Sequence, residues 1–215
     1  AAAYAVGDKA AVSRSVDGVT RRLVTLGVLP VLLVALLGPP TIGLVFGERW
    51  LQAGHFVALL APETLAMFIT SPIVPLMNVL EMHRFNVLIQ GSMLVLRAGS
   101  LWVGGTITGT PEGALTAFAI TVPVGLALQH MVLLRASNVS LRRFVGHFFK
   151  HIVWALPSAA VWYALEHIAH AHWLVVATAT VSAGVPYVWL AMREDPEGAE
   201  LVWQLLARVR AKLGV

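Results

Sequence analysis

The sequence contains no cysteine, so disulfide bonds, thiolate metal ligands and cysteine nucleophiles are excluded. It is also poor in charge, because Asp, Glu, Lys and Arg make up only 12% of its 215 residues. That share is about half of what soluble domains carry, and a water-soluble fold of this size needs more polar surface. With 58% hydrophobic residues and a mean hydropathy of +0.77, the composition indicates a membrane protein.

Recognisable catalytic and cofactor motifs are absent as well. The sequence contains no nucleophile–base triad, phosphate-binding loop or zinc motif, so we predict no enzymatic activity, no cofactor and no bound metal. His167, His170 and His172 come nearest to a metal cluster, but Glu166 is the only carboxylate close to them in the sequence. We therefore expect these histidines to be polar residues of an outer loop. The net charge of +4 does not indicate nucleic-acid binding, because the cations form short clusters between apolar runs.

Long apolar runs dominate the chain. A helix that spans a bilayer needs about 20 mainly apolar residues. Six segments qualify, and they cover residues 23–46, 51–80, 85–106, 113–134, 151–168 and 173–192. The linkers between the first four are short and force antiparallel neighbours. We predict an all-α, polytopic bundle of about six transmembrane helices over residues 23–192. Residues 1–22 would be a cytoplasmic loop or the end of a preceding helix, and residues 193–215 a cytoplasmic tail.

Prolines interrupt several of these segments, and the second contains Pro62, Pro72 and Pro75. Within a helix bundle, neighbouring helices and Ser or Thr side chains can satisfy the carbonyl groups that a proline frees. Two interpretations are open for these prolines: kinks that serve packing, or bending points of a transporter.

The basic residues predict the orientation of the chain. Of the 15 Lys and Arg residues, 13 fall on one side of the predicted membrane, only Arg49 falls on the other, and Arg97 lies within a helix. Such an imbalance marks the cytoplasmic side, so we expect both ends of the chain there. Residues 196–213 form an amphipathic pattern with flanking cations, which predicts a helix on anionic membrane lipids. The alternative is a helix that packs on a partner protein.

Arg97 is the main candidate for a functional residue. An arginine at the centre of a spanning helix costs about 2.5–3.5 kcal/mol on insertion scales, so it usually faces a cavity or a partner. Asn86, Gln90, Arg97 and Ser100 share one helical face, which we expect to line a hydrated path or to bind an anionic substrate. The alternative is a structural ion pair or an arginine that reaches the outer headgroups. Glu63 could pair with Arg97, bind a coupling proton, or simply lie at the interface.

The region from Pro39 to Leu80 resembles a known family. It contains Phe46-Gly47-Glu48 followed by Trp50, then Ala53-Gly54, and then the step Leu60-Ala61-Pro62. Gly113-Ala114 opens a later helix in a similar way. These features resemble the lipid-linked oligosaccharide flippases, or polysaccharide exporters, of the multidrug and oligosaccharide flippase superfamily. The resemblance covers roughly residues 1–135.

The resemblance implies the C-terminal part of a fourteen-helix transporter with two lobes, whose N-terminal lobe would be the missing partner of this chain. It implies that a lipid-diphosphate-linked saccharide is flipped across a bacterial inner membrane for cell-surface polysaccharide synthesis. Arg97 would attract the anionic head, and Asn86, Gln90 and Ser100 would donate or accept hydrogen bonds. Three alternatives are open: a cation-coupled multidrug exporter that uses Glu63, a membrane enzyme of polysaccharide assembly, and a scaffold that transports nothing.

Overall fold

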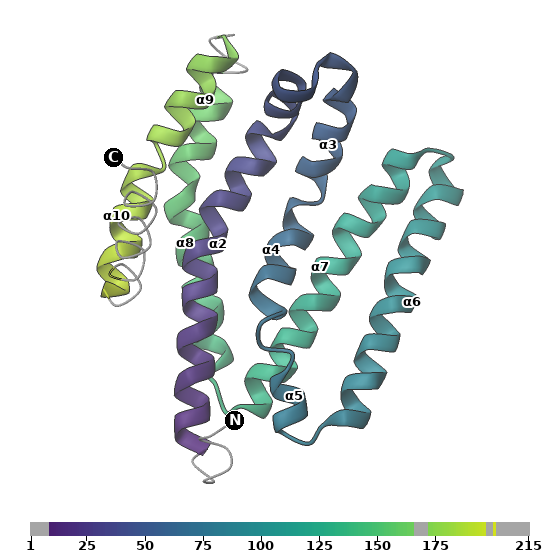
Figure 1. The fold of residues 1–215 in the computed structure, drawn as a ribbon, viewed down its shortest axis with the longest axis vertical. Helices are drawn as coiled ribbons and strands as arrows, with labels where there is room; N and C mark the ends of the chain where they lie inside the picture. Colours follow the sequence, from purple (N-terminus) through teal and green to yellow (C-terminus); the bar gives the residue numbers. More distant parts are fainter. Residues whose placement is uncertain (1–8, 166–171, 197–199, 201–215) are drawn as a thin grey trace, which may run out of the picture. The chain divides into compact units, whose positions relative to one another are not determined.

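The computed structural model describes residues 9–165, 172–196 and 200, and all regular structure in these residues is helical (Figure 1). The elements are α2 (Lys9–Phe46), the 3-10 helix η1 (Glu48–Trp50), α3 (Leu51–Leu59), α4 (Ala61–Thr70), α5 (Leu76–Val79), α6 (His83–Thr108), α7 (Pro111–Ala136), α8 (Leu141–Tyr163), α9 (Trp173–Ser182) and α10 (Val185–Glu194). Most of the predicted tail and two of the three outer-loop histidines, His167 and His170, lie outside the described residues.

Four stretches of the described chain are long and apolar enough to cross a membrane: Ala10–Phe46, His83–Thr108, Pro111–Ala136 and Trp173–Glu194. A bent pair, Glu48–Leu59 with Ala61–Thr70, makes a fifth if it counts as one span. The all-helical fold is therefore confirmed in the described residues, together with four or five stretches suited to crossing a membrane, while the predicted count of about six is not confirmed. The fifth predicted segment corresponds to α8, which begins about ten residues earlier than expected and includes Arg142, Arg143 and Lys150.

α2 is longer than the apolar segment that predicted it. Its 38 residues extend about 57 Å at 1.5 Å per residue, whereas the hydrocarbon core of a bilayer is about 30 Å thick. Residues 9–22, which we expected to form a loop or the end of an earlier helix, are the first turns of α2. The apolar pattern marks only the part of this helix that suits lipid, and the charged turns continue the same helix.

The second predicted segment is not one helix. α3 and α4 meet at a bend of 47°, and α4 begins at Ala61 with Pro62 in its first turn. Pro72 and Pro75 then lie at the turns that separate α4 from α5. Proline suits the first turn of a helix, where its missing N–H costs nothing, but it cannot continue a helix regularly from the preceding turn.

The chain forms two compact units, Ala1–Val153 and Trp154–Val215. In the first unit α2 packs on α3 and α4, α4 packs on α7, and α7 packs on α6 (Figure 1). Two apolar clusters hold these helices together. The first cluster consists of Val12, Val16, Ile73, Met77, Leu133, Leu134 and Val139, and the second of Met93, Val122 and Leu126. In the second unit α9 and α10 follow one another, and the Arg193 guanidinium lies 3.8 Å from the centre of the Trp189 ring.

The α6–α7 hairpin shows how closely the helices approach. Gly109 ends α6 in the left-handed conformation, with φ of 67°, and the Thr110 side chain caps α7 by accepting a hydrogen bond from the Gly113 N–H. Five residues before Gly109, a Cβ added to Gly104 would lie 2.5 Å from the Gly113 carbonyl oxygen. Glycine is therefore required at position 104, because the two backbones leave no space for a side chain.

Candidate functional site

An ion pair joins the two charged residues that the sequence analysis singled out within the apolar segments. An Arg97 guanidinium nitrogen on α6 lies 3.5 Å from Glu63 Oε1 on α4, and the side chains are 38% and 16% exposed, respectively. The structural pairing that we considered as an alternative is therefore present in this conformation. The two opposite charges attract each other. Because the Arg97 side chain is 38% exposed, its guanidinium also stays accessible to a ligand.

Local structure explains why both residues reach this position. Glu63 lies in the first turn of α4, next to Pro62, where the positive end of the helix dipole favours a carboxylate. Arg97 lies on the face of α6 that also carries Met93 and Ser100, both of which are buried. Arg97 therefore lies on the side of α6 that faces the neighbouring helices. The Nε atom of its guanidinium has no hydrogen-bond partner among the described residues.

The other members of the predicted polar face have different surroundings. The Ser100 hydroxyl donates to the Arg97 carbonyl oxygen at 3.0 Å, so this bond stays within α6. Gln90 is exposed, whereas Asn86 is half-buried and its Oδ1 atom has no hydrogen-bond partner. The structure thus brings Arg97 to Glu63, whereas the hydroxyl of Ser100 bonds to the backbone of Arg97 and not to its guanidinium. Whether these four residues bind one substrate stays a prediction.

A groove of about 340 Å³ lies beside the ion pair. It is lined by Glu63, Thr64, Met67, Phe68, Ser71 and Pro72, so α4 and the turn that follows it supply the lining. Glu63 is the only charged residue in this lining, and Met67, Phe68 and Pro72 are its apolar members. The groove suits a molecule that has both an apolar part and a group able to interact with Glu63 or its partner.

A second polar feature, the α2–α8 seam, was missed in the sequence analysis. It follows α2 at intervals of four residues and consists of Ser13, Asp17, Arg21 and Thr25, which meet Asn138, Arg143, His147 and His151. The Asp17 carboxylate lies 2.9 Å from Arg21 and 3.9 Å from Arg143. The four-residue spacing was visible in the sequence, but nothing there indicated that these two helices pair.

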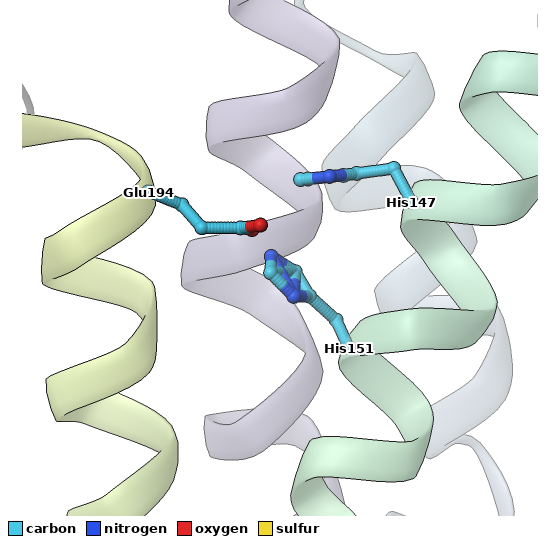
Figure 2. Close-up of side chains that lie close together, drawn as sticks. All are labelled: His147, His151 and Glu194. Atoms are coloured by element: carbon cyan, nitrogen blue, oxygen red, sulfur yellow. The ribbon is translucent and has the colours of Figure 1, made fainter.

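Two histidines form the part of the seam farthest from the start of α8. Figure 2 shows His147 and His151 one turn apart on α8, and their ring centres are 4.3 Å apart. Their Nε2 atoms lie 3.3 and 2.6 Å from the Thr25 hydroxyl oxygen. Imidazoles at this spacing are the side chains of the seam best suited to a transition metal. His172, by contrast, caps α9 by accepting from the Leu174 N–H at 3.4 Å.

In the described residues, the structure is all-helical, has four or five stretches long and apolar enough to cross a membrane, and has an interhelical ion pair between apolar helices. Comparisons with protein-family models, with curated proteins and with solved structures gave no match to this chain. The resemblance to the oligosaccharide flippases therefore depends on the sequence motifs alone.

Proposed function

We propose that this chain is part of a membrane transporter that flips a lipid-diphosphate-linked saccharide across the bacterial inner membrane. The observation that carries the proposal is the ion pair between Arg97 and Glu63. It connects α6 to α4 directly after the 47° bend, in a segment interrupted by three prolines. In such an ion pair, an anionic substrate can take the place of the Glu63 carboxylate at Arg97.

The chemistry of the pair favours such an exchange. A guanidinium keeps its charge when water is removed and offers a planar fork of N–H donors that fits two phosphate oxygens. A diphosphate that binds Arg97 displaces the Glu63 carboxylate, and α4 is then released from α6 at its first turn. The lipid chain of the same substrate would lie along apolar side chains such as Met67 and Phe68 in the adjoining groove.

The proposal includes the larger architecture that the resemblance implies. The chain supplies the last helices, about six, of a fourteen-helix transporter, and an N-terminal lobe completes the cavity. The protein lies in the inner membrane with both ends in the cytoplasm, as the 13-to-1 distribution of cations predicts.

Orientation can be tested with single cysteines, because the natural sequence has none to interfere. Ser140→Cys, in the link between α7 and α8, should react with an impermeant maleimide only from the cytoplasmic side. Arg49→Cys, in η1, should react only from outside, since the cations predict these positions on opposite sides. Labelling of both variants from outside in intact cells would refute the orientation.

A flipping assay tests the transport activity itself. The full transporter, reconstituted into vesicles with an undecaprenyl-diphosphate-linked saccharide, should expose the inner-leaflet saccharide to an added glycosidase. In vesicles that contain the transporter, we expect the glycosidase to cleave nearly all of the saccharide. In empty vesicles, the half in the inner leaflet should stay protected from the enzyme. Protection equal to that of empty vesicles, with correctly folded protein present, would contradict the proposal.

One observation favours a second candidate, a cation-coupled exporter of amphiphilic cations. Glu63 is the only charged residue in the groove lining, and an acidic group beside apolar side chains suits a positively charged, partly apolar molecule. The two candidates differ in the charge that matters: Arg97 for the saccharide lipid, and Glu63 for the exporter. Efflux of a cationic dye that Glu63→Gln abolishes and Arg97→Ala preserves would favour the exporter.

A further inference from the structure

Two histidines of α8 and a threonine of α2 bring together three atoms that are able to bind a metal ion. His147 and His151 are four residues apart on α8, and Figure 2 shows both rings extending to the same side of this helix. Their Nε2 atoms lie 3.3 and 2.6 Å from one oxygen, that of the Thr25 hydroxyl. Two imidazole nitrogens and a hydroxyl oxygen therefore converge between α2 and α8.

Hydrogen bonds can satisfy this arrangement only if the two imidazoles differ. A hydroxyl group has a single O–H donor, so Thr25 can donate to one Nε2 atom, and the other imidazole has to donate its own N–H. A metal ion, in contrast, accepts a lone pair from both nitrogens and from the oxygen. Two histidines at positions i and i+4 on one helical face are also the spacing with which zinc enzymes hold their metal.

The distances are close to those of a tetrahedral zinc site. Zinc bonds to nitrogen and oxygen are about 2.0–2.2 Å long, so neighbouring ligand atoms of a tetrahedron lie about 3.3–3.5 Å apart. His147 Nε2 already lies 3.3 Å from the Thr25 oxygen. His151 Nε2 has to move about 0.7 Å from its position at 2.6 Å, and a small rotation of the imidazole ring provides this movement.

The nearby cations of the α2–α8 seam are engaged by a carboxylate. The guanidinium groups of Arg21 and Arg143 lie 2.9 and 3.9 Å from the Asp17 carboxylate, which is two turns before Thr25 on α2. The Asp17 charge offsets part of the repulsion that these guanidinium groups exert on a metal ion.

The ligand types indicate which metals fit. The chain has no cysteine, so imidazole nitrogens are the softest ligands available apart from methionine sulfur. Imidazole suits Zn²⁺, Cu²⁺ and Ni²⁺, whereas Ca²⁺ and Mg²⁺ prefer sites made of oxygen atoms.

We propose that His147, His151 and Thr25 bind a divalent transition metal ion, with water completing its coordination. The ion ties α2 to α8, because its ligands come from both helices. His151 is 0% exposed and His147 is half-buried, which limits the competition of bulk water with the protein ligands. The metal site is independent of the proposed substrate, because none of its three residues lines the groove beside Glu63.

Zinc binding tests the metal site in the full chain, purified in detergent and stripped of metal with a chelator. Equilibrium dialysis against buffered Zn²⁺ should give about one ion per chain. We expect His147→Gln and His151→Gln each to weaken the affinity at least about tenfold, because glutamine lacks the imidazole nitrogen. His55→Gln, at an exposed histidine of α3, is the matched control and should leave the affinity unchanged. No bound Zn²⁺ in the unsubstituted chain, or an unchanged affinity in His151→Gln, would overturn the proposal.

Two further variants test the composition of the site. Thr25→Val removes the hydroxyl at nearly constant volume, and we expect an affinity about tenfold weaker. An unchanged affinity would overturn the contribution of α2. Loss of zinc in His172→Gln, with retention in both α8 variants, would place the metal near α9 and overturn the proposal.

Copper spectroscopy gives a result that does not depend on how well a variant folds. With one equivalent of Cu²⁺, the electron paramagnetic resonance spectrum of the unsubstituted chain should show splitting from about two imidazole nitrogens. A spectrum with oxygen ligands alone would overturn the proposal. Thermal unfolding without metal verifies that the variants fold, and Zn²⁺ should raise the midpoint of the unsubstituted chain but not that of His151→Gln.

Discussion

Arg97→Ala is expected to lower saccharide export by at least about tenfold, which corresponds to about 1.4 kcal/mol of transition-state stabilisation. The guanidinium is the group that the proposed substrate exchanges with Glu63, and alanine cannot replace its donors. Arg97→Lys should restore part of the activity if charge alone matters, and little if the planar fork is needed. The measurements are export in cells and the abundance of the protein in the membrane.

The same substitution also removes a structural contact, and this effect must be separated from substrate binding. Surface pairs contribute about 0–1 kcal/mol, and removing one partner of a buried pair costs about 3–5 kcal/mol. With Arg97 at 38% exposure and Glu63 at 16%, we expect an intermediate loss, nearer the surface value. Arg84→Ala, at an exposed cation near the start of the same helix, is the matched control.

A charge reversal distinguishes the two roles. Glu63→Arg combined with Arg97→Glu restores the ion pair with opposite polarity. Recovery of both abundance and export in this double variant would favour a structural pair, whereas recovery of abundance alone would favour substrate binding at Arg97. Normal export by Arg97→Ala at normal abundance would eliminate a functional role for this arginine.

Gly104→Ala and Gly99→Ala, five residues apart on α6, are expected to differ in their effect on stability. A Cβ at Gly104 would lie 2.5 Å from the Gly113 carbonyl oxygen, 2.6 Å from Ala117 Cβ and 3.0 Å from Ala114 Cα. These atoms belong mostly to the backbone of α7, so the two helices must separate. We expect a loss of about 1–3 kcal/mol, in the range for overpacked sites. Small residues allow such close helix contacts in membranes, where packing provides much of the association energy.

At Gly99 an added Cβ meets nothing within 4 Å. Alanine is the better helix former by up to about 1 kcal/mol, so Gly99→Ala should be neutral or stabilising. Thermal unfolding in the same detergent measures the stability of both variants. The two substitutions are identical in kind, and the two sites differ in whether α7 packs against them. Equal shifts for the two variants would contradict the close approach of α6 and α7.

The sequence predicted α6 and α7 to within two residues at each end, because Gly109, Thr110 and Pro111 separate two long, mainly apolar segments. Both interpretations of the prolines imply a bend in the second segment, and a bend of 47° occurs next to Pro62. The division of residues 51–80 into α3, α4 and α5 was not predicted, since hydropathy is insensitive to the direction of a helix. The early starts of α2 and α8 were missed for a related reason. Their first turns are charged, and an apolar pattern shows only the part of a helix that suits lipid.

The candidate site was predicted in part. A charged residue within an apolar segment needs a partner or a cavity, and this argument alone named Glu63 as a possible partner of Arg97. The α2–α8 seam could not be found in the same way. Its hydrogen bonds join residues more than 120 positions apart, such as Thr25 and His151, and only the packing of the helices shows that they meet.

One turn of α2 connects the groove to the seam. A Cβ added to Gly27 would lie 2.9 Å from Phe68 Cδ1 and 3.0 Å from Leu65 Cδ1, so α4 touches the α2 backbone there. Phe68 lines the groove, and Thr25, two residues before Gly27, holds both seam histidines. The absence of a side chain at position 27 therefore lets the Phe68 ring pack directly on the backbone of α2, within one turn of the contacts that Thr25 makes with α8. The wall of the groove and the seam with α8 thus share a single turn of one helix.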